Sequence, residues 1–309
     1  MNEALPFRKA KGSALITGNA AGAAWINMRN ARALPYLLIA PAALFLTVLF
    51  VVPLVQTVAL AFQQRGVWGF GNFVRMTDDL NFSDAAVNSF RLVLVAVPLQ
   101  FVLALGMAMM LRHVKRGRDI VLWIWSIPLG ISDLAAGLVW LAIVTDQGFL
   151  NSMLFHMGLI SGPEAWLTYE TPIALFVAVA VAEIWRATAI VLLILVAGVQ
   201  MLPKEYGEAA EVFGASPWRA FIRVTLPLLK PSIQTALILR TVLAFEAFAV
   251  VLAIGGRNFP VLISEAYNWQ HFNQDTGVAA SYAVVVMGIS LAATLVFLRV
   301  LRVPREQQG

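Results

Sequence analysis

Six long apolar runs constrain the fold of this chain more than any other feature of its sequence. They cover about residues 34–62, 87–111, 119–145, 172–200, 234–254 and 278–300. A helix needs about 20 apolar residues to cross a hydrocarbon layer of about 30 Å, and each run is long enough. The sequence therefore predicts an all-α integral membrane protein with six spans. Its composition agrees, because only 13% of the residues are charged, against about 25% in soluble domains.

Lysine and arginine predict which side of the membrane each connecting segment faces. Sixteen of the 22 lie in four segments that alternate along the chain with poorer ones: 1–33, 112–118, 201–233 and the tail from Arg299. Three lie in the alternate loops 63–86, 146–171 and 255–277. Basic residues are retained on the cytoplasmic side, so both termini are expected in the cytoplasm. Because the basic residues flank apolar runs, the net charge of +5 does not indicate a nucleic-acid partner.

The expected organisation is a cytoplasmic segment 1–33, a transmembrane domain 34–302 and a cytoplasmic tail 303–309. The first apolar run is too long for a cleavable signal peptide and is expected to remain as an anchor. The chain has no cysteine and three scattered histidines, so we expect no catalytic residue and no metal site. It also lacks the GxxxxGK[ST] loop that cradles nucleotide phosphates, which excludes a nucleotide hydrolase of that type.

The loop 201–233 carries the most specific motif. Glu208-Ala209-Ala210 is followed by Gly214 and then by Val224, Leu226 and Pro227. Acidic Glu205 and Glu208 suit the first turns of a helix that begins after Pro203. Gly214 can end that helix, and Pro217 suits the start of a second one. We therefore expect two short helices beneath the bilayer that present a small apolar surface to a partner.

This spacing resembles the EAA loop of ATP-binding-cassette importer permeases, EAA-x3-G-x9-I-x-LP, with Val224 in place of isoleucine. The resemblance implies a six-helix type I permease fold whose EAA coupling helix docks in a cleft of a separate ATPase. The implied coupling residues are Glu205, Glu208, Ala209, Ala210, Gly214, Leu226 and Pro227. Sugar-type members usually carry an acid where this chain has Phe213. ATP and Mg would be used by the ATPase, and no cofactor would be bound by this chain.

Further pieces resemble the carbohydrate branch of that family, which includes permeases for maltose, trehalose and glycerol phosphate. They are Gly71-Asn72-Phe73, Gly148-Phe149-Leu150-Asn151, Trp166-Leu167, Glu183-Ile184-Trp185-Arg186 and Gly255-Gly256. The resemblance implies a prokaryotic cell membrane location. It also implies three kinds of partner: a second, related permease subunit, two ABC ATPase subunits and an extracytoplasmic solute-binding protein.

Ionisable residues inside the spans are the candidates for a solute path. A charge at mid-bilayer costs about 2.5–3.5 kcal/mol on insertion scales, so such residues face the interior or pair. Glu183 and Arg186 share a helix face at i,i+3 and can pair, whereas Arg240 is nearer the cytoplasmic end of its span and could snorkel. The path candidates are Asp133, Glu183, Trp185, Arg186, Phe245 and Glu246. The alternative is that the charged ones form salt bridges between helices or contact the second permease.

Three other functions compete with a sugar importer. An importer of a polyamine, an amino acid or phosphate would have the same loop. An ion-coupled secondary transporter would suit intramembrane acids but leaves the EAA spacing unexplained. A membrane enzyme would need a catalytic triad, a metal cluster or paired acids at a membrane face, and the sequence contains no such motif.

Overall fold

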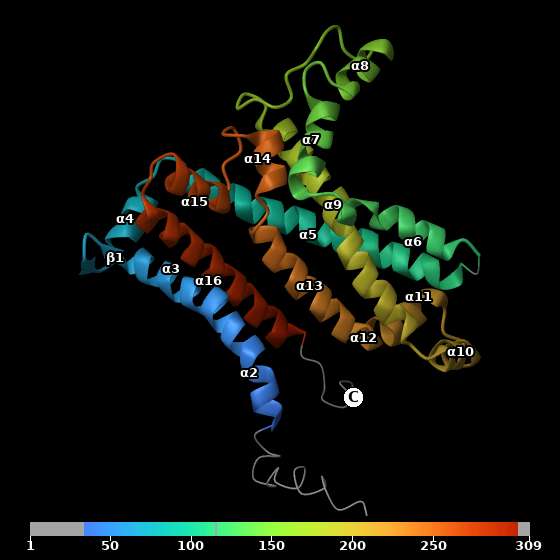
Figure 1. Cartoon of the computed structure of the whole chain (residues 1–309). Helices are drawn as coiled ribbons and strands as arrows, with labels where there is room; N and C mark the ends of the chain where they lie inside the picture. The colour runs from blue at the N-terminus through green and yellow to red at the C-terminus, as the bar shows by residue number, and fades with distance from the viewer. Residues whose placement is uncertain (1–33, 115, 302–309) are drawn as a thin grey trace, which may run out of the picture. The chain divides into compact units, whose positions relative to one another are not determined.

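The computed structural model describes residues 34–114 and 116–301, and this part of the chain is almost entirely helical (Figure 1). The predicted cytoplasmic segments, 1–33 and 303–309, lie outside the described residues. The chain divides into two compact units, one ending at Gln56 and one beginning at Thr57.

The first unit contains α2 (Leu34–Leu46), the π-helical turn η1 (Thr47–Val51) and the start of α3 (Val52–Phe62). Apolar residues occupy all faces of α2, which is typical of a helix surrounded by lipid or other helices. Pro53 has no N–H to donate to the preceding turn, and the helix widens there into η1 instead of ending. Pro35–Phe62 is long and apolar enough to span a membrane, in agreement with the first predicted span.

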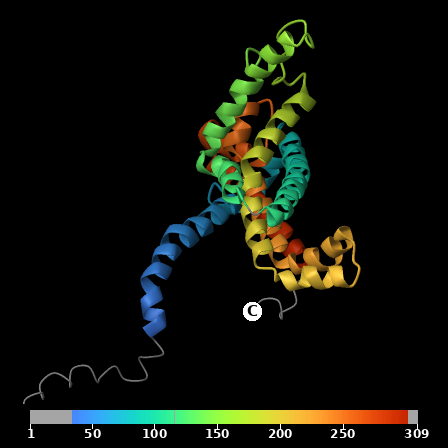
Figure 2. The same cartoon turned by 90° about the vertical axis from the view of Figure 1, so that its right-hand side faces the viewer.

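The second unit is a bundle of long helices with short helices at both ends (Figures 1 and 2). The long helices are α5 (Phe82–His113), α9 (Pro172–Gln200), α13 (Lys230–Phe245) and α16 (Thr276–Val300). One end holds β1 (Gln63–Gln64), β2 (Val67–Trp68), α4 (Gly71–Thr77), α8 (Phe149–His156) and α15 (Leu262–His271). The opposite end holds α10 (Lys204–Val212), α11 (Pro217–Ala220), the π-helical η3 (Phe221–Thr225) and α12 (Leu226–Leu228).

Small side chains bring the central helices together. Helix α5 lies along α9, and α13 packs against both. Ala104 and Ala108 of α5 and Ala236 of α13 are buried in one cluster with Leu195 of α9. A methyl group on Gly198 of α9 would collide with the side chain of Ser232. Close backbone approach through small residues is how helices associate in lipid, where the hydrophobic effect does not drive them together.

Two predicted spans are broken in the structure, and the helices there do not begin and end where the apolar runs do. The predicted span 119–145 consists of α6 (Arg118–Ser126), a 3-10 turn η2 (Ile127–Gly130) and α7 (Asp133–Val144). The predicted span 234–254 is divided into α13 and α14 (Ala249–Gly255). The two outer pieces, α7 and α14, pack so closely that a Cβ on Gly137 would lie 2.6 Å from the Cβ of Ala253.

Among the described residues, five helices are long and apolar enough to cross a membrane, and the bent pair Pro217–Leu228 and Lys230–Phe245, counted as one span, makes six. These two pieces meet at 68°. The prediction of an all-α membrane protein with six spans is confirmed, although the fifth span begins in the loop that carries the EAA spacing.

Two buried asparagines hold the loops at the α8 end. The amide of Asn72 donates to the carbonyls of Leu60, Ala61 and Gln63 at 3.0–3.3 Å. Asn151 donates to the carbonyl of Glu164 at 2.9 Å and accepts from its N–H at 3.1 Å. Loop backbone that leaves regular structure needs such partners. This explains why an amide side chain stands at these two positions of the sequence.

Candidate functional site

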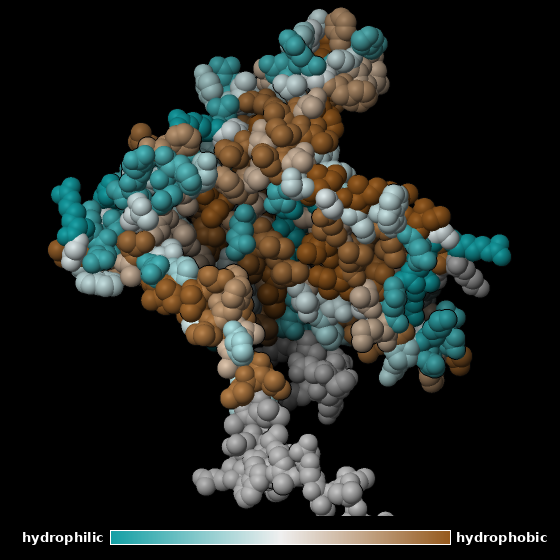
Figure 3. All heavy atoms as spheres, in the orientation of Figure 1, coloured by the Kyte–Doolittle hydropathy of each residue, from teal (hydrophilic) through white to brown (hydrophobic). Residues whose placement is uncertain are grey.

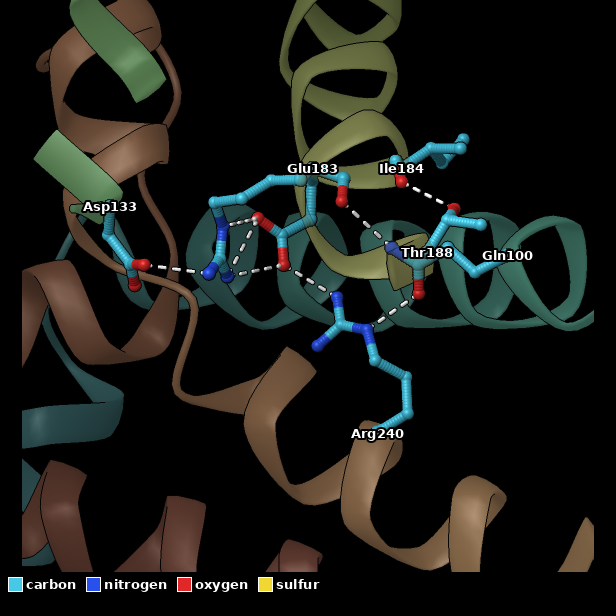
Figure 4. A network of polar contacts seen from close by, with 7 residues as sticks. Gln100, Asp133, Glu183, Ile184, Thr188 and Arg240 are labelled. Carbon is cyan, nitrogen blue, oxygen red and sulfur yellow. Dashed lines mark hydrogen bonds and ion pairs between the residues drawn. The ribbon is translucent and has the colours of Figure 1, made fainter. Parts of the chain in front are cut away.

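A line of alternating charges lies beside the broken spans and joins three helices, and an amide on a fourth helix hydrogen-bonds to one end of it (Figure 4). Asp133 is the first residue of α7, where an acid suits the positive end of the helix dipole. It accepts from Nη1 of Arg186 at 2.7 Å. Arg186 also donates to Glu183 one turn earlier on α9, at 3.2 Å. The i,i+3 pair predicted from the sequence is therefore present, and its arginine reaches a second helix.

Glu183 has a second basic partner on α13. Its Oε1 accepts from Nη2 of Arg240 at 2.5 Å, and both side chains are buried, at 0% and 1% exposure. Gln100 of α5 completes the line, since its Oε1 accepts from Nε of Arg240 at 2.6 Å and its amide donates to the carbonyl of Glu183 at 2.9 Å. One carboxylate on α9 thus ties α13 to α7 through two arginines.

Arg240 does not snorkel, although its place near the end of the predicted span would allow it. The side chain lies inside the bundle because Glu183 and Gln100 neutralise and hydrogen-bond it there. Gln100, fully buried, was missed altogether. The available signal was an amide in an otherwise apolar run, because a buried amide needs hydrogen-bond partners.

The other path candidates differ in exposure. Asp133 is 51% exposed and Arg186 17% exposed in their side chains. Glu246 is exposed at the break between α13 and α14. Trp185 is half-buried and meets Trp140 edge-on with ring centroids 6.1 Å apart. Phe245 is buried against Phe90 at 5.4 Å.

These exposures divide the path candidates into exposed and buried residues. Asp133 and Glu246 are exposed in this conformation, and Arg186 is partly exposed. Glu183 and Phe245 contact only protein atoms in this conformation. The line of charges carries equal numbers of acids and bases, so it can lie within apolar helices without a net buried charge. Of the two predicted arrangements, salt bridges between helices are the one that the distances show.

Five of the seven coupling candidates fall on α10 and on the glycine turn that leads into α11. Glu205, Glu208 and Ala209 of α10 are exposed, and Ala210 is half-buried. Gly214 has a φ of +73°, a conformation that favours glycine, and it reverses the chain after α10. The side chain of Ser216 then caps α11 by accepting from the N–H of Arg219. The predicted order of helix, glycine turn and second helix is confirmed.

Large apolar side chains cover the tip of this pair. Val212 is 85% exposed, Phe213 88% and Trp218 68%. Figure 2 shows the pair, in yellow and orange, projecting sideways from the bundle. In Figure 3 hydrophilic residues gather around α10, below a largely hydrophobic middle. Val212 and Trp218 were absent from the predicted coupling residues, because a lone apolar residue in a loop is not distinctive in a sequence.

Leu226 and Pro227 lie apart from that tip. They belong to α12, directly before the 68° bend into α13, and Leu226 packs against the buried cluster of α5 and α9. The predicted coupling residues therefore form two groups: one is exposed on α10 and the glycine turn, and the other joins this pair to the fifth span.

The long helices form a bundle of membrane spans. A helical pair projects from one end of it, and loops held by buried asparagines lie at the other. This arrangement defines a membrane-embedded transport subunit. The chain belongs to the family of binding-protein-dependent transport system inner membrane components, whose profile matches residues 100–305. It is thus a multi-pass inner-membrane subunit of an ABC importer. The sequence resemblance predicted this class.

Similar proteins cover almost the whole chain. The sulfoquinovosyl glycerol transport system permease protein SmoG of Agrobacterium fabrum is 30% identical over 90% of this chain and 93% of its own length. The trehalose/maltose transport system permease protein MalF of Thermococcus litoralis is 29% identical over 88% of this chain and 95% of its own. Both are named as transport permeases, which confirms the prediction of a transport component instead of an enzyme.

A solved structure shows the same fold. A chain in the crystal structure of a bacterial alginate ABC transporter, bound to its periplasmic protein with an alginate pentasaccharide, is 22% identical and superposes with a TM-score of 0.76. The match covers 89% of this chain and 95% of that one. This agreement confirms the type I permease fold.

Proposed function

We propose that this chain forms half of the translocation path of an ATP-driven sugar importer. The observation that carries the proposal is the match, over about nine-tenths of the chain, to permeases named for sulfoquinovosyl glycerol and for trehalose and maltose. The solute is then a sugar or a sugar-containing compound, and importers of polyamines, amino acids or phosphate are not favoured.

The solute path runs beside the two broken spans. Broken helices in membrane proteins are tolerated where they line a cavity, and they often hold binding sites. Each break here carries an exposed acid, Asp133 or Glu246, and Arg186 stands beside Asp133. Carboxylates accept hydrogen bonds from sugar hydroxyls, and guanidinium groups donate them. Trp185 supplies aromatic surface close to these positions, and Glu183 holds Arg186 in place. Phe245 is buried in this conformation and reaches the path only when the helices move.

Coupling to ATP hydrolysis takes place at the α10–α11 pair. Its exposed acids, alanines and Phe213 dock on an ATPase subunit, which uses ATP and Mg. Leu226 and Pro227 pass the movement to α13 through the bend at residue 229. The α10 end therefore lies in the cytoplasm with both termini, and no cofactor is held by this chain.

The assembly contains a second, related permease, two ATPase subunits and an extracytoplasmic binding protein. The six spans of this chain supply half of the translocation path, and the second permease supplies the other half. The binding protein docks at the α8 end, where Asn72 and Asn151 fix the loops.

The test is an ATPase assay on the reconstituted importer. The chain is co-purified with its ATPase and binding protein, placed in liposomes, and assayed against a panel of sugars, amino acids and polyamines. We expect one sugar or sugar ester to stimulate hydrolysis. Stimulation by non-sugar solutes alone would reject the sugar assignment. Uptake that persists without the ATPase and collapses with an uncoupler would reject ATP coupling.

A further inference from the structure

The structure contains a second polar site, at the α10 end, that the transport mechanism does not use. It is a cavity of about 320 Å³ where the end of α5, the start of α6, the end of α9 and the start of α10 meet. Three basic residues, Arg112, Arg118 and Lys204, line it together with the amide of Gln200. Its volume is at the small end of ligand pockets, roughly 300–1,000 Å³.

The three cations of this cavity lack acidic partners. Within the described part of the chain, none of them forms an ion pair, and none of the residues lining the cavity is acidic. The Nε of Arg118 is buried, and no described residue accepts a hydrogen bond from it. Elsewhere in this protein, buried arginine is neutralised by Glu183. A cluster of positive charges without acidic partners attracts anions.

Helix ends add to the same field. Arg118 is the first residue of α6, and Lys204 is the first residue of α10. Neither helix has a side-chain cap at its N-terminus. The free N–H groups of a first turn and the helix dipole both favour a phosphate or other anion. Each first turn also carries an acid, Asp119 or Glu205, but both are exposed and neither lines the cavity, so the two helix ends add to the three side-chain charges inside it.

The surroundings of the cavity match a lipid. Helix α6 continues from Arg118 with exposed Ile120, Trp123 and Ile124, at 65%, 71% and 53%. Apolar and tryptophan side chains beside a basic pocket suit acyl chains next to an anionic head group. A free phosphate ion would use the cations but not this apolar flank.

We propose that this cavity binds the phosphate group of an anionic phospholipid at the cytoplasmic surface of the membrane. The proposal rests on the orientation given under Proposed function. Arg112 also lies over the helix that couples to the ATPase, since a Cβ on Gly207 would be 3.5 Å from its Nη2. A bound phosphate therefore bridges α10 to α5 and α6 and holds the coupling helix against the bundle.

The test measures lipid binding to the full-length chain in an uncharged detergent by native mass spectrometry. The probes are phosphatidylglycerol, phosphatidylcholine and inorganic phosphate, each added separately. The variant R112Q/R118Q/K204Q removes the three cations. The matched control R219Q/R223Q/K230Q removes three other basic residues of the predicted cytoplasmic surface that do not line the cavity.

We expect the wild type and the control to bind phosphatidylglycerol more tightly than phosphatidylcholine. In the cavity variant, affinity for phosphatidylglycerol should fall by about fivefold for each cation removed. Inorganic phosphate that binds with the same dependence, while phosphatidylglycerol does not, would support the phosphate site and assign a free ion as its ligand. The proposal would be overturned if all three proteins bound phosphatidylglycerol equally. It would also be overturned if the wild type bound neither phosphatidylglycerol nor inorganic phosphate.

The result is independent of sugar transport. A chain that binds phosphatidylglycerol through these residues but imports no sugar would retain this site and lose the proposed substrate. If the triple variant does not fold, the same lipid-binding comparison is made with the single variant K204Q, whose position is exposed. K230Q is then the control.

Discussion

Glu183 is the residue on which the buried charges of this bundle depend. It accepts from Arg186 and Arg240, and neither Glu183 nor Arg240 reaches solvent. Such a pair adds little stability compared with well-packed apolar residues, but the loss of one partner leaves an uncompensated charge. Its value to a transporter is positional, because the carboxylate determines where Arg186 lies beside Asp133.

The variant Glu183→Gln should therefore destabilise the protein by about 3–5 kcal/mol, the usual cost of breaking a buried ion pair. The double variant E183Q/R240Q should recover much of that loss, because it leaves no unpaired charge at α13. Thermal unfolding in detergent measures both, and a double-mutant cycle isolates the pair. A single variant as stable as the wild type would show that Arg240 has another counter-ion.

Glu265 on α15 gives the loops at the α8 end a dependence on pH. Burial raises the pKa of its carboxyl above the ordinary value of 4.5, and the charge of Asp79 raises it further. Asp79 is held in place by Trp269 and Tyr282, whose Nε1 and hydroxyl donate to it at 2.6 and 2.9 Å. Glu265 therefore binds its proton more tightly in the folded protein than in the unfolded chain.

Stability should fall as the pH rises from about 4.5 through the raised pKa of Glu265, because the folded state holds a proton that the unfolded state has released. Glu265→Gln should remove that decline and be more stable than the wild type at neutral pH. Melting temperatures between pH 4 and 8 measure the effect. An identical decline in the variant would assign it to another group.

Asp275 provides a control of opposite sign. Burial alone would raise the pKa of this carboxyl, but the N–H of Val278 and the guanidinium of Arg75 bring it below the ordinary value of 3.8. Its contribution is present above that ordinary value and is lost as the pH falls through the lowered one. Asp275→Asn should therefore lower stability at neutral pH, where Glu265→Gln raises it.

At the scale of the helix, the sequence predicted where apolar segments lie but not where they break. The break at residues 127–132 had signals, since Pro128 and Gly130 interrupt an apolar run. The break after Phe245 contains neither proline nor glycine, so no local preference indicates it. It depends on the packing of α14 against α7, through Gly137 and Ala253, and contacts between distant segments are not visible in a single sequence.

The prediction at the scale of the helix concerns the tip of the α10–α11 pair. Phe213→Ala should leave the fold intact, because the ring is 88% exposed. It should weaken ATPase binding by about 30-fold, which corresponds to the loss of one aromatic hot spot of about 2 kcal/mol. Titration of the purified ATPase against the detergent-solubilised chain measures the affinity.

The control for Phe213 is Phe155→Ala. Phe155 is also a large exposed ring, at 54%, but it lies on α8 at the opposite end of the bundle. Its removal should leave ATPase affinity unchanged. Equal losses from both variants would mean that the ATPase contact is non-specific, and no loss from either would place it away from the tip of the pair.

At the scale of the molecule, the lengths of the apolar runs and one spaced motif predicted more of the architecture than helical periodicity did. The number of spans and the transporter class came from apolar length and one spaced motif, and the basic residues predict a sidedness that the labelling experiment below measures. The sequence could not predict which face of each helix lies inside, because a helix such as α9, apart from Glu183 and Arg186, is apolar on every side. Arg240 shows the consequence: its depth along the helix allowed snorkelling, and its direction toward Glu183 decided otherwise.

Sidedness is testable because the chain has no cysteine. Leu80→Cys introduces a thiol at a 95% exposed position between α4 and α5, and Phe213→Cys introduces one at the tip of the α10–α11 pair. In intact cells a membrane-impermeant maleimide should label the first variant and should label the second only after permeabilisation. The opposite pattern would place α10 outside the cell, where neither an ATP-hydrolysing partner nor a cytoplasmic lipid head group could reach it. Both the coupling role and the phosphate site therefore depend on this single measurement.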